Sequence, residues 1–270
     1  MKITKAILPV AGKGTRVMPL TLHQPKGMIA VADKPLVHYV IDELVASGLT
    51  EIILVLGPGQ EVFKNYIAYL QQDHSWKKIK FKFAYQITPI GDGDAVYSAK
   101  KFIKKGEAFV VSFCDDIFGS NNPPTKTMIQ HFIKKNAPTI LLEKIALESV
   151  SKYGVVKPVN EKIKNFHSII DLVEKPAIKE APSNLAIVGR YILPYKIFAH
   201  IKNLYQNKNE EIKLVHALRG YICGEKKNIW GLENGHLRFD CGSKEGLIQA
   251  QAHFASIHPY SQNSHRKTLK

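Results

Sequence analysis

The segment AILPVAGKGTRVMPLTLHQPKGM at residues 6–28 joins an apolar run to a loop of glycines and cations. Its first part predicts a buried β-strand. Gly12 and Gly14 follow the strand and predict a tight turn, while Arg16 and Lys26 add positive charge to the same loop. Because backbone N–H groups in such a turn can surround phosphate oxygens, the segment indicates a phosphate-binding site at the end of a strand.

Two common phosphate-binding fingerprints do not fit this loop. A P-loop requires Gly-Lys-Ser/Thr after four spacer residues, and no such sequence is present. The dinucleotide-binding fingerprint requires a third glycine at position 17, which is Val17. The loop therefore belongs to neither class, and the rest of the chain has to indicate its chemistry.

Apolar runs that predict strands alternate with segments of helical periodicity through the first half of the chain. The expected strands are 5–10, 51–57, 81–86, 109–114 and 139–145, and the expected helices are 35–48, 60–72, 94–103 and 125–135. Such alternation predicts a parallel sheet covered by helices on both faces. Ligands bind such sheets beyond the carboxyl ends of the strands, which is where the glycine loop falls.

The second half predicts a mixed or antiparallel extension of the sheet. Its expected elements are strands at 153–159, 168–176 and 184–193, helices near 195–204 and 211–222, a hairpin at 228–242 with an Asn-Gly turn at 234 and 235, and a terminal helix at 243–257. We therefore expect an α/β fold with a Rossmann-like mixed, mostly parallel sheet. It should form a single domain over residues 1–257, followed by a basic flexible tail at 258–270.

Composition excludes several classes of protein. The 270 residues are 45% hydrophobic and 23% charged, which is ordinary, but the net charge is +15. Lysine pairs spread this charge along the chain, without the aromatic-interleaved basic stripe of nucleic-acid-binding proteins. Cys114, Cys223 and Cys241 match neither a zinc site nor a disulfide framework, and no apolar stretch could span a membrane. We expect a cytoplasmic protein with neither nucleic-acid nor membrane partners.

Thr15-Arg16 after the glycines, followed by Pro25-Lys26, complete a signature that resembles the sugar-1-phosphate nucleotidylyltransferase family, G-x-G-T-R and then P-K. Further motifs resemble the bacterial UTP–glucose-1-phosphate uridylyltransferases (UDP-glucose pyrophosphorylases) of that family. In chain order they are VADKPLVHYVIDE, Gln86 with Gly91-Asp92-Gly93, FCDDIF, SKYGVV, LVEKP, APSNLAIVGRYIL and FDCGSKEG. These ordered motifs extend over nearly the whole chain, which argues against chance agreement.

The resemblance implies transfer of a uridylyl group from UTP to glucose 1-phosphate, with Mg²⁺ as cofactor and a homodimer or homotetramer as the assembly. It implies a nucleotide-binding half over about 1–115 and a sugar-phosphate-binding half over about 116–257. The attacking phosphate oxygen is ionised at neutral pH, so alignment and charge neutralisation suffice. The implied residues are Arg16 and Lys26 for catalysis, Ala11, Gly12, Gly14, Thr15, Gln86 and Gly91 for the nucleotide, Gly154, Glu174, Lys175 and Asn184 for the sugar phosphate, and Asp115 and Asp240 for the metal.

Simpler interpretations exist for several of these residues. Asp116 fits a helix N-cap better than a metal ligand, and Asp240 can also be a cap. An isolated Glu174–Lys175 pair is ordinarily a surface ion pair that contributes little to stability. Tyr153 is expected in the core.

The sequence departs from the family pattern at several positions around the expected substrates. These are Gly27 in place of Glu, Cys114 in place of the Gly before the metal aspartate, Asp92 and Asp94 within the family's G-L-G-H-A, and Lys213, Val215 and His216 in place of Gln, Thr and Asp. Two alternatives follow. One is the same reaction with dTTP or another sugar 1-phosphate, and the other is a catalytically weak paralogue that regulates an active enzyme.

Overall fold

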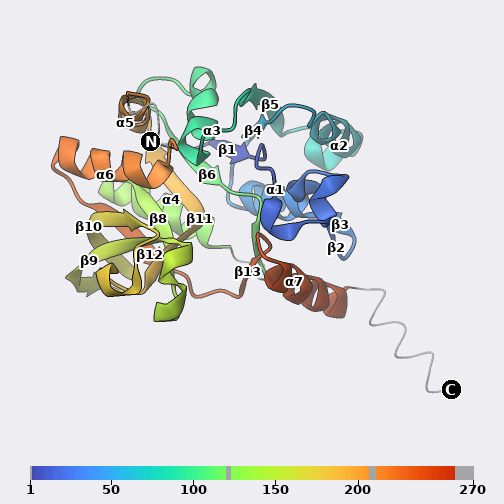
Figure 1. Cartoon of the computed structure of the whole chain (residues 1–270). Helices are drawn as coiled ribbons and strands as arrows, with labels where there is room; N and C mark the ends of the chain where they lie inside the picture. The colour runs from blue at the N-terminus through green and yellow to red at the C-terminus, as the bar shows by residue number, and fades with distance from the viewer. Residues whose placement is uncertain (1, 120–122, 207–210, 259–270) are drawn as a thin grey trace.

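Nine strands form the central sheet of this computed structural model, which describes residues 2–119, 123–206 and 211–258 (Figure 1). Their spatial order is β5-β4-β1-β6-β11-β8-β12-β10-β9. The bounds are β1 Lys5–Pro9, β4 Glu51–Leu56, β5 Lys80–Tyr85, β6 Ala108–Ser112, β8 Thr139–Lys144, β9 Gly154–Ile163, β10 Phe166–Glu174, β11 Leu185–Pro194 and β12 Ile229–Glu233. Two small sheets pair β2 (Ala30–Val31) with β3 (Lys34–Pro35) and β7 (Asp116–Phe118) with β13 (Arg238–Asp240).

In the first half of the chain, the strands of the central sheet are parallel, as the alternation with helices predicts. β1 pairs with β4 and β6, and β4 pairs with β5. β11 is antiparallel to β6 and β8, and beyond it the sheet mixes both directions. The expected mixed α/β fold is confirmed, and the glycine loop leaves β1 at the carboxyl edge of its parallel part.

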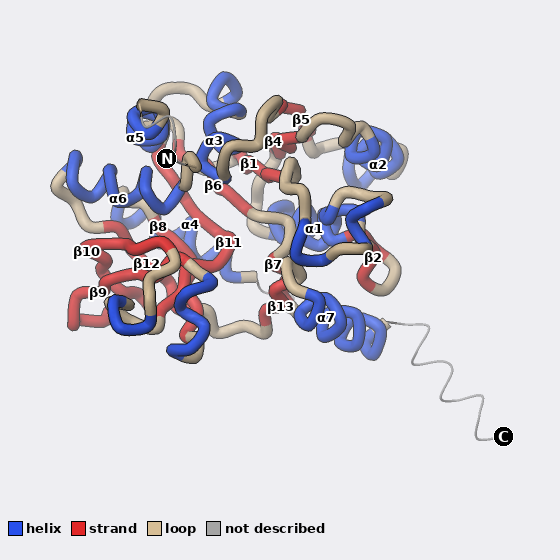
Figure 2. Tube along the Cα trace, in the orientation of Figure 1, coloured by secondary structure: helices blue, strands red, loops and turns tan. Residues whose placement is uncertain are grey.

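Helices cover both faces of the sheet (Figure 2). The helices of one face are α1 Leu36–Ala46, α2 Val62–Leu70, α4 Pro124–Lys135 and α7 Lys244–Ile257, and those of the other are α3 Asp92–Ser98, α5 Ile197–Leu204 and α6 Leu214–Glu225. Alternation along β1 separates the two cores, because Ala6 and Leu8 face the first group and Ile7 faces the second.

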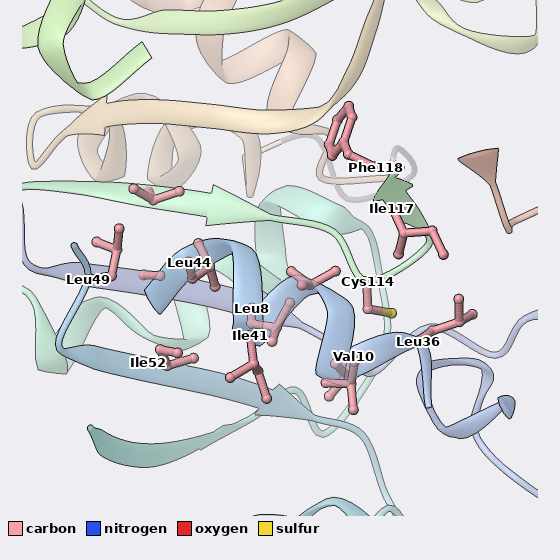
Figure 3. Close-up of a cluster of buried hydrophobic side chains, with 14 of the residues drawn as sticks. Leu8, Val10, Leu36, Ile41, Leu44, Leu49, Ile52, Cys114, Ile117 and Phe118 are labelled. Atoms are coloured by element: carbon pink, nitrogen blue, oxygen red, sulfur yellow. The ribbon is translucent and has the colours of Figure 1, made fainter. Parts of the chain in front are cut away.

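Helix α1 forms on a stripe of apolar residues at helical spacing. The buried members of this stripe are Leu36, Val37, Val40, Ile41 and Leu44. Figure 3 shows Ile41 and Leu44 beside Leu8 of β1, with Cys114 in the same cluster. The core thus reaches the turn after β6, where the predicted metal ligand Asp115 follows Cys114.

The expected hairpin at 228–242 is wrong. β12 lies between β8 and β10 and is hydrogen-bonded to both, so no edge of β12 is free for β13. The Asn234 side chain instead makes two hydrogen bonds to the backbone of His236. It donates to the His236 carbonyl at 2.9 Å and accepts from the His236 N–H at 3.0 Å. β13 continues to β7, where Asp240 stands opposite Asp116. An Asn-Gly pair thus marks the turn but does not determine the partner of the next strand.

Helix α7 begins with a side-chain cap that the sequence interpretation did not name. Ser243 is the N-cap, and its hydroxyl oxygen accepts from the Gly246 N–H at 3.1 Å. Apart from His258, the expected basic tail at 258–270 lies outside the described residues. In the described parts of the chain, no helix has the length and apolar character that crossing a bilayer requires.

Ser243→Ala is expected to lower the free energy of unfolding by about 1 kcal/mol, because it removes the acceptor for a helix N-terminal N–H. For a domain of this size the melting temperature should fall by about 2–4 °C. Thermal unfolding followed by circular dichroism measures the change. Ser256→Ala, in the last turn of the same helix, is the matched control and should change the melting temperature less. Equal losses in the two variants would contradict the capping role.

Candidate functional site

A pocket of about 960 Å³ opens at the carboxyl ends of β1, β5 and β6. This volume lies at the upper end of the range for small-molecule sites. The predicted site residues that line it are Ala11, Gly12, Arg16, Lys26, Gln86, Gly91, Asp115, Gly154, Glu174, Lys175 and Asp240. Gly14, Thr15 and Asn184 do not line it. Eleven of the fourteen predicted site residues, scattered over the chain, therefore lie in the wall of one pocket.

The glycine turn after β1 is built by two glycines with different tasks. A Cβ on Gly12 would meet no atom within 4 Å, so the backbone there faces open space in the pocket. Gly14 has a left-handed φ of 64°, and a Cβ there would lie 2.7 Å from Thr21 Cγ2. Thr15 begins the short 3₁₀ helix Thr15–Val17. Gly14 and Thr15 thus shape the turn, while the Gly12 backbone lines the open pocket.

Lys26 and Asp115 form the central ion pair of the pocket. The distance from Lys26 Nζ to Asp115 Oδ2 is 2.5 Å, and Arg16 Nη2 lies 3.9 Å from the same oxygen. Burial raises the pKa of the Asp115 carboxyl, but the charge and hydrogen bond of Lys26, a backbone hydrogen bond and the Arg16 charge together hold that pKa below its ordinary value. Burial likewise lowers the pKa of Lys26, and Asp115 more than offsets it. Asp115 is therefore ionised and Lys26 charged at neutral pH.

Asp240 brings a second carboxylate to Asp115. A Cβ on Gly242 would lie 2.7 Å from Arg16 Nη2, 2.8 Å from Asp240 Oδ1 and 2.9 Å from Asp115 Oδ2, so these three atoms converge on one point. The Tyr153 hydroxyl donates to Asp240 Oδ2 at 2.9 Å and fixes its orientation. Asp240 is not the cap of α7, because Ser243 holds that position.

The two carboxylates fit a magnesium ion. Mg²⁺ in nucleotide enzymes is bound by one or two carboxylates together with substrate phosphates. Among the described residues, no group of three or more His, Cys, Asp or Glu side chains that could hold a metal ion is found. Asp115 and Asp240 fit the case in which two carboxylates bind the ion together with substrate phosphates.

Asp116 does not cap a helix, contrary to the sequence interpretation. It is the first residue of β7, and it is ion-paired with Arg238 of β13. Its Oδ2 also accepts from the Gly189 N–H at 3.1 Å. Burial raises its pKa, and the Arg238 charge opposes that rise. The carboxylate therefore closes the contact between β7, β11 and β13 instead of ending a helix.

Arg190 of β11 holds the turn that carries Asp115. Its guanidinium is fully buried and donates to the carbonyl oxygens of Phe113 at 3.0 Å and Asp116 at 2.6 Å, on either side of Cys114-Asp115. Glu43 of α1 accepts from Arg190 Nη2 at 2.7 Å and neutralises it. Because this bidentate pair is rigid, it fixes the backbone from which the Asp115 side chain extends.

Three of the residues predicted to bind the sugar phosphate, Gly154, Glu174 and Lys175, line the pocket. A Cβ on Gly154 would lie 3.2 Å from Glu174 Oε2, so glycine leaves the carboxylate accessible. Burial raises the pKa of Glu174, and the ammonium of Lys213, 3.9 Å from Oε1, opposes that rise. Asn184 Nδ2 instead donates to the Ile145 carbonyl at 3.0 Å, outside the pocket lining. Asn184 thus has a structural contact within the protein, and its sugar contact stays a prediction.

The departures from the family pattern have partners in the structure. A Cβ on Gly27 would lie 3.1 Å from the Phe63 ring, so Phe63 fills the space beside this glycine. The Asp92 carboxylate accepts from the Leu214 N–H at the start of α6 at 2.8 Å. Asp94 accepts from Gln86 Nε2 at 2.7 Å. Neither of these two carboxylates is therefore left without a hydrogen-bond donor.

Three residues of the site were missed or misassigned by sequence reasoning. Tyr153 lines the pocket and binds Asp240, although it was expected in the core. Its position directly before Gly154 in the SKYGVV motif could have indicated that Tyr153 lies at the site. Arg190 and Arg238 carry no local signal, because their carboxylate partners come from distant elements.

The comparisons with known proteins agree with this geometry. Residues 5–256 match the family model described as nucleotidyl transferase. The chain is 32% identical to UTP–glucose-1-phosphate uridylyltransferase 2 of Streptococcus pyogenes serotype M3, across 96% of this chain and 92% of that protein.

Two solved structures share the fold over almost their full length. A UDP-glucose pyrophosphorylase complexed with UDP-glucose is 33% identical with a TM-score of 0.86, and the match covers 95% of this chain and 100% of that one. The UTP-bound UGPase from Acinetobacter baumannii is 30% identical with a TM-score of 0.84, and the match covers 100% and 99% of the two chains.

Proposed function

Because the chain belongs to the nucleotidyl transferase family, we propose that it transfers the uridylyl group of UTP to glucose 1-phosphate, giving UDP-glucose and pyrophosphate. Relatives that are 32% identical over 96% of the chain carry the name of this activity, and two similar solved structures hold UTP or UDP-glucose. The observation that carries the proposal is the convergence of Arg16, Asp115 and Asp240 beside Lys26 in one pocket. These are the charges that a nucleotidyl transfer needs.

In this reaction a phosphate oxygen of glucose 1-phosphate attacks the α-phosphorus of UTP. The oxygen is already ionised at neutral pH, so the protein supplies alignment and charge neutralisation and no general base. The backbone at Ala11 and Gly12 receives the phosphates. Arg16 and Lys26 stabilise the charge that develops at the α-phosphate and on the departing pyrophosphate. Lys26 exchanges its Asp115 partner for a phosphate oxygen, which its flexible stem permits.

Asp115 and Asp240 are the residues that would hold Mg²⁺. When bound, the ion neutralises phosphate charge and orients the phosphate oxygens for in-line displacement. Tyr153 keeps the Asp240 carboxylate turned toward Asp115, and Arg190 keeps the Asp115 turn in place. The chain thereby presents both ligands without having to rearrange its backbone.

The two ends of the pocket bind the two organic groups. Gln86 and Gly91 contact the nucleobase, Gly154 and Glu174 receive the sugar, and Lys175 binds the phosphate of glucose 1-phosphate. Lys213 lies beside Glu174 and keeps the sugar end close to electrical neutrality. We also infer a cytoplasmic homodimer or homotetramer with one catalytic domain over residues 1–257.

Pyrophosphate release from UTP and glucose 1-phosphate in the presence of MgCl₂ tests the proposal. We expect one pyrophosphate per UDP-glucose formed, loss of release with excess EDTA, and recovery when MgCl₂ is restored. The assay is repeated with dTTP and with other sugar 1-phosphates. Turnover with dTTP but not UTP would change the assigned nucleotide. If the folded protein turns over no pair of nucleotide and sugar 1-phosphate, the reaction is wrong and the alternative of a regulatory paralogue is left.

A further inference from the structure

The Gln86 side chain is held by two hydrogen-bond acceptors. Gln86 is only 4% exposed, and its Nε2 donates to the Gly91 carbonyl at 2.9 Å and to Asp94 Oδ2 at 2.7 Å. A carbonyl and a carboxylate can only accept, so the amide nitrogen must face them. In the described part of the chain no group donates to Gln86 Oε1. Because Gln86 lines the pocket, this oxygen is the atom that it offers to a ligand.

Both acceptors are fixed by the surrounding fold. Asp94 Oδ1 accepts from the hydroxyl of Tyr205, which ends α5, and the Tyr205 ring packs edge-on against Tyr97 at 5.5 Å between centroids. Burial and the contact with Asp94 raise the pKa of Tyr205, so it remains a donor at neutral pH.

The Gly91 carbonyl is fixed from the other side by a backbone contact. The neighbouring backbone is bound to Ile212, with Gly93 N to Ile212 O and Ile212 N to Ile90 O both at 2.8 Å. A Cβ on Gly91 would lie 2.3 Å from Ile212 O, so only glycine permits this approach. The amide plane of Gln86 therefore has one favoured orientation.

We propose that Asp94 is a positioning residue that sets the choice of nucleobase by turning the Gln86 amide oxygen toward the pocket. The proposal rests on the proposed function, in which Gln86 contacts the base. Uracil and thymine carry an N3–H that an amide oxygen accepts, whereas N3 of cytosine carries a lone pair that it repels. An amide free to rotate would present N–H donors to cytosine instead. Asp94 thus favours UTP and dTTP over CTP without touching the base.

The test compares the wild-type chain with Asp94→Leu, Asp94→Asn and Ser98→Ala, using kcat and KM for UTP, dTTP and CTP. Leucine is close in size but has no acceptor, whereas asparagine keeps a carboxamide oxygen for Gln86 Nε2. Ser98 is the matched control, because its hydroxyl contacts the Asp94 backbone and not the carboxylate. Thermal unfolding verifies that each variant is folded.

We expect Asp94→Leu to lower kcat/KM for UTP about tenfold, mainly through KM, and to lower the ratio of UTP to CTP efficiency by a similar factor. UTP and dTTP should change together, since they share N3–H. Asp94→Asn should retain most of the selectivity, and Ser98→Ala should retain all of it. A common loss for all three nucleotides in Asp94→Leu, with the UTP to CTP ratio unchanged, would overturn the proposal and leave Asp94 a structural role.

A binding measurement separates this proposal from the proposed reaction. If the wild-type chain shows no turnover, the reaction assignment fails, and calorimetric titration with UTP and CTP still reports base selectivity. A wild-type preference for UTP that Asp94→Leu removes supports the positioning role. No preference in the wild-type chain, or the same preference in Asp94→Leu, contradicts it.

Discussion

Asp115→Asn is expected to lower turnover by about a thousandfold while the protein stays folded. The substitution keeps the shape of the side chain but removes the negative charge on which Lys26 and Arg16 converge and which the proposed magnesium site requires. An amide oxygen is a much weaker magnesium ligand than a carboxylate. The loss should therefore be partly relieved at high MgCl₂, and steady-state kinetics over a range of MgCl₂ concentrations measures both effects.

Asp171→Asn is the matched control for Asp115→Asn. Asp171 is also a carboxylate on the sheet, but its partner is Arg219 at the surface, with 2.8 Å between Arg219 Nε and Asp171 Oδ1. The turnover of the Asp171→Asn variant should equal that of the wild-type chain. An Asp115→Asn variant with ordinary turnover and ordinary MgCl₂ dependence would mean that the metal is held elsewhere.

Glu43→Gln is expected to lower the free energy of unfolding by about 3–5 kcal/mol. Glu43 is the counter-charge of Arg190, whose guanidinium is fully buried, so the substitution leaves an uncompensated charge in the core. The carboxylate also accepts from the Thr125 hydroxyl, which loses a charged acceptor. Urea denaturation measures the loss. Turnover should fall as well, because Arg190 holds the carbonyls around Asp115.

The neighbouring position on α1 provides the control for Glu43→Gln. Asp42 carries the same charge, but its side chain is 40% exposed and pairs with Lys34 and His38 near the surface. Asp42→Asn should change the free energy of unfolding by less than about 1 kcal/mol. Replacing the pair together, with Glu43→Leu and Arg190→Met, should restore much of the stability. A loss below about 1 kcal/mol in Glu43→Gln would show that Arg190 is not stabilised by this pair.

Local periodicity predicted the order of strands and helices well, because each element buries an apolar stripe that is visible in the sequence. Examples are the stripe of α1 and the fully buried run of β4. The partner of β13 was not predictable in this way. It depends on β12 being hydrogen-bonded on both edges, and this follows from the arrangement of the complete sheet. A turn signal between two short strands cannot carry that information.

The site was predictable where a residue follows a strand and belongs to a motif. Arg16, Lys26, Asp115 and Asp240 all lie in or beside the pocket on that basis. Residues that act through distant partners were not visible. The Tyr153 contact to Asp240 joins positions 87 apart, and the Arg190 contact to Glu43 joins positions 147 apart. Such pairs appear only when the chain has folded.

The short β7–β13 ladder determines at which stage of folding the carboxylates of Asp115 and Asp240 come together. It joins Arg238 to Asp116, 122 positions earlier, and places Asp240 opposite Asp116. Closing so long a loop costs chain entropy, so this contact forms after the local ones. During synthesis the glycine loop, Lys26 and Asp115 leave the ribosome well before Asp240. An unfinished chain therefore has its glycine turn but only one of the two carboxylates, and the pair is complete only after β13 has paired with β7.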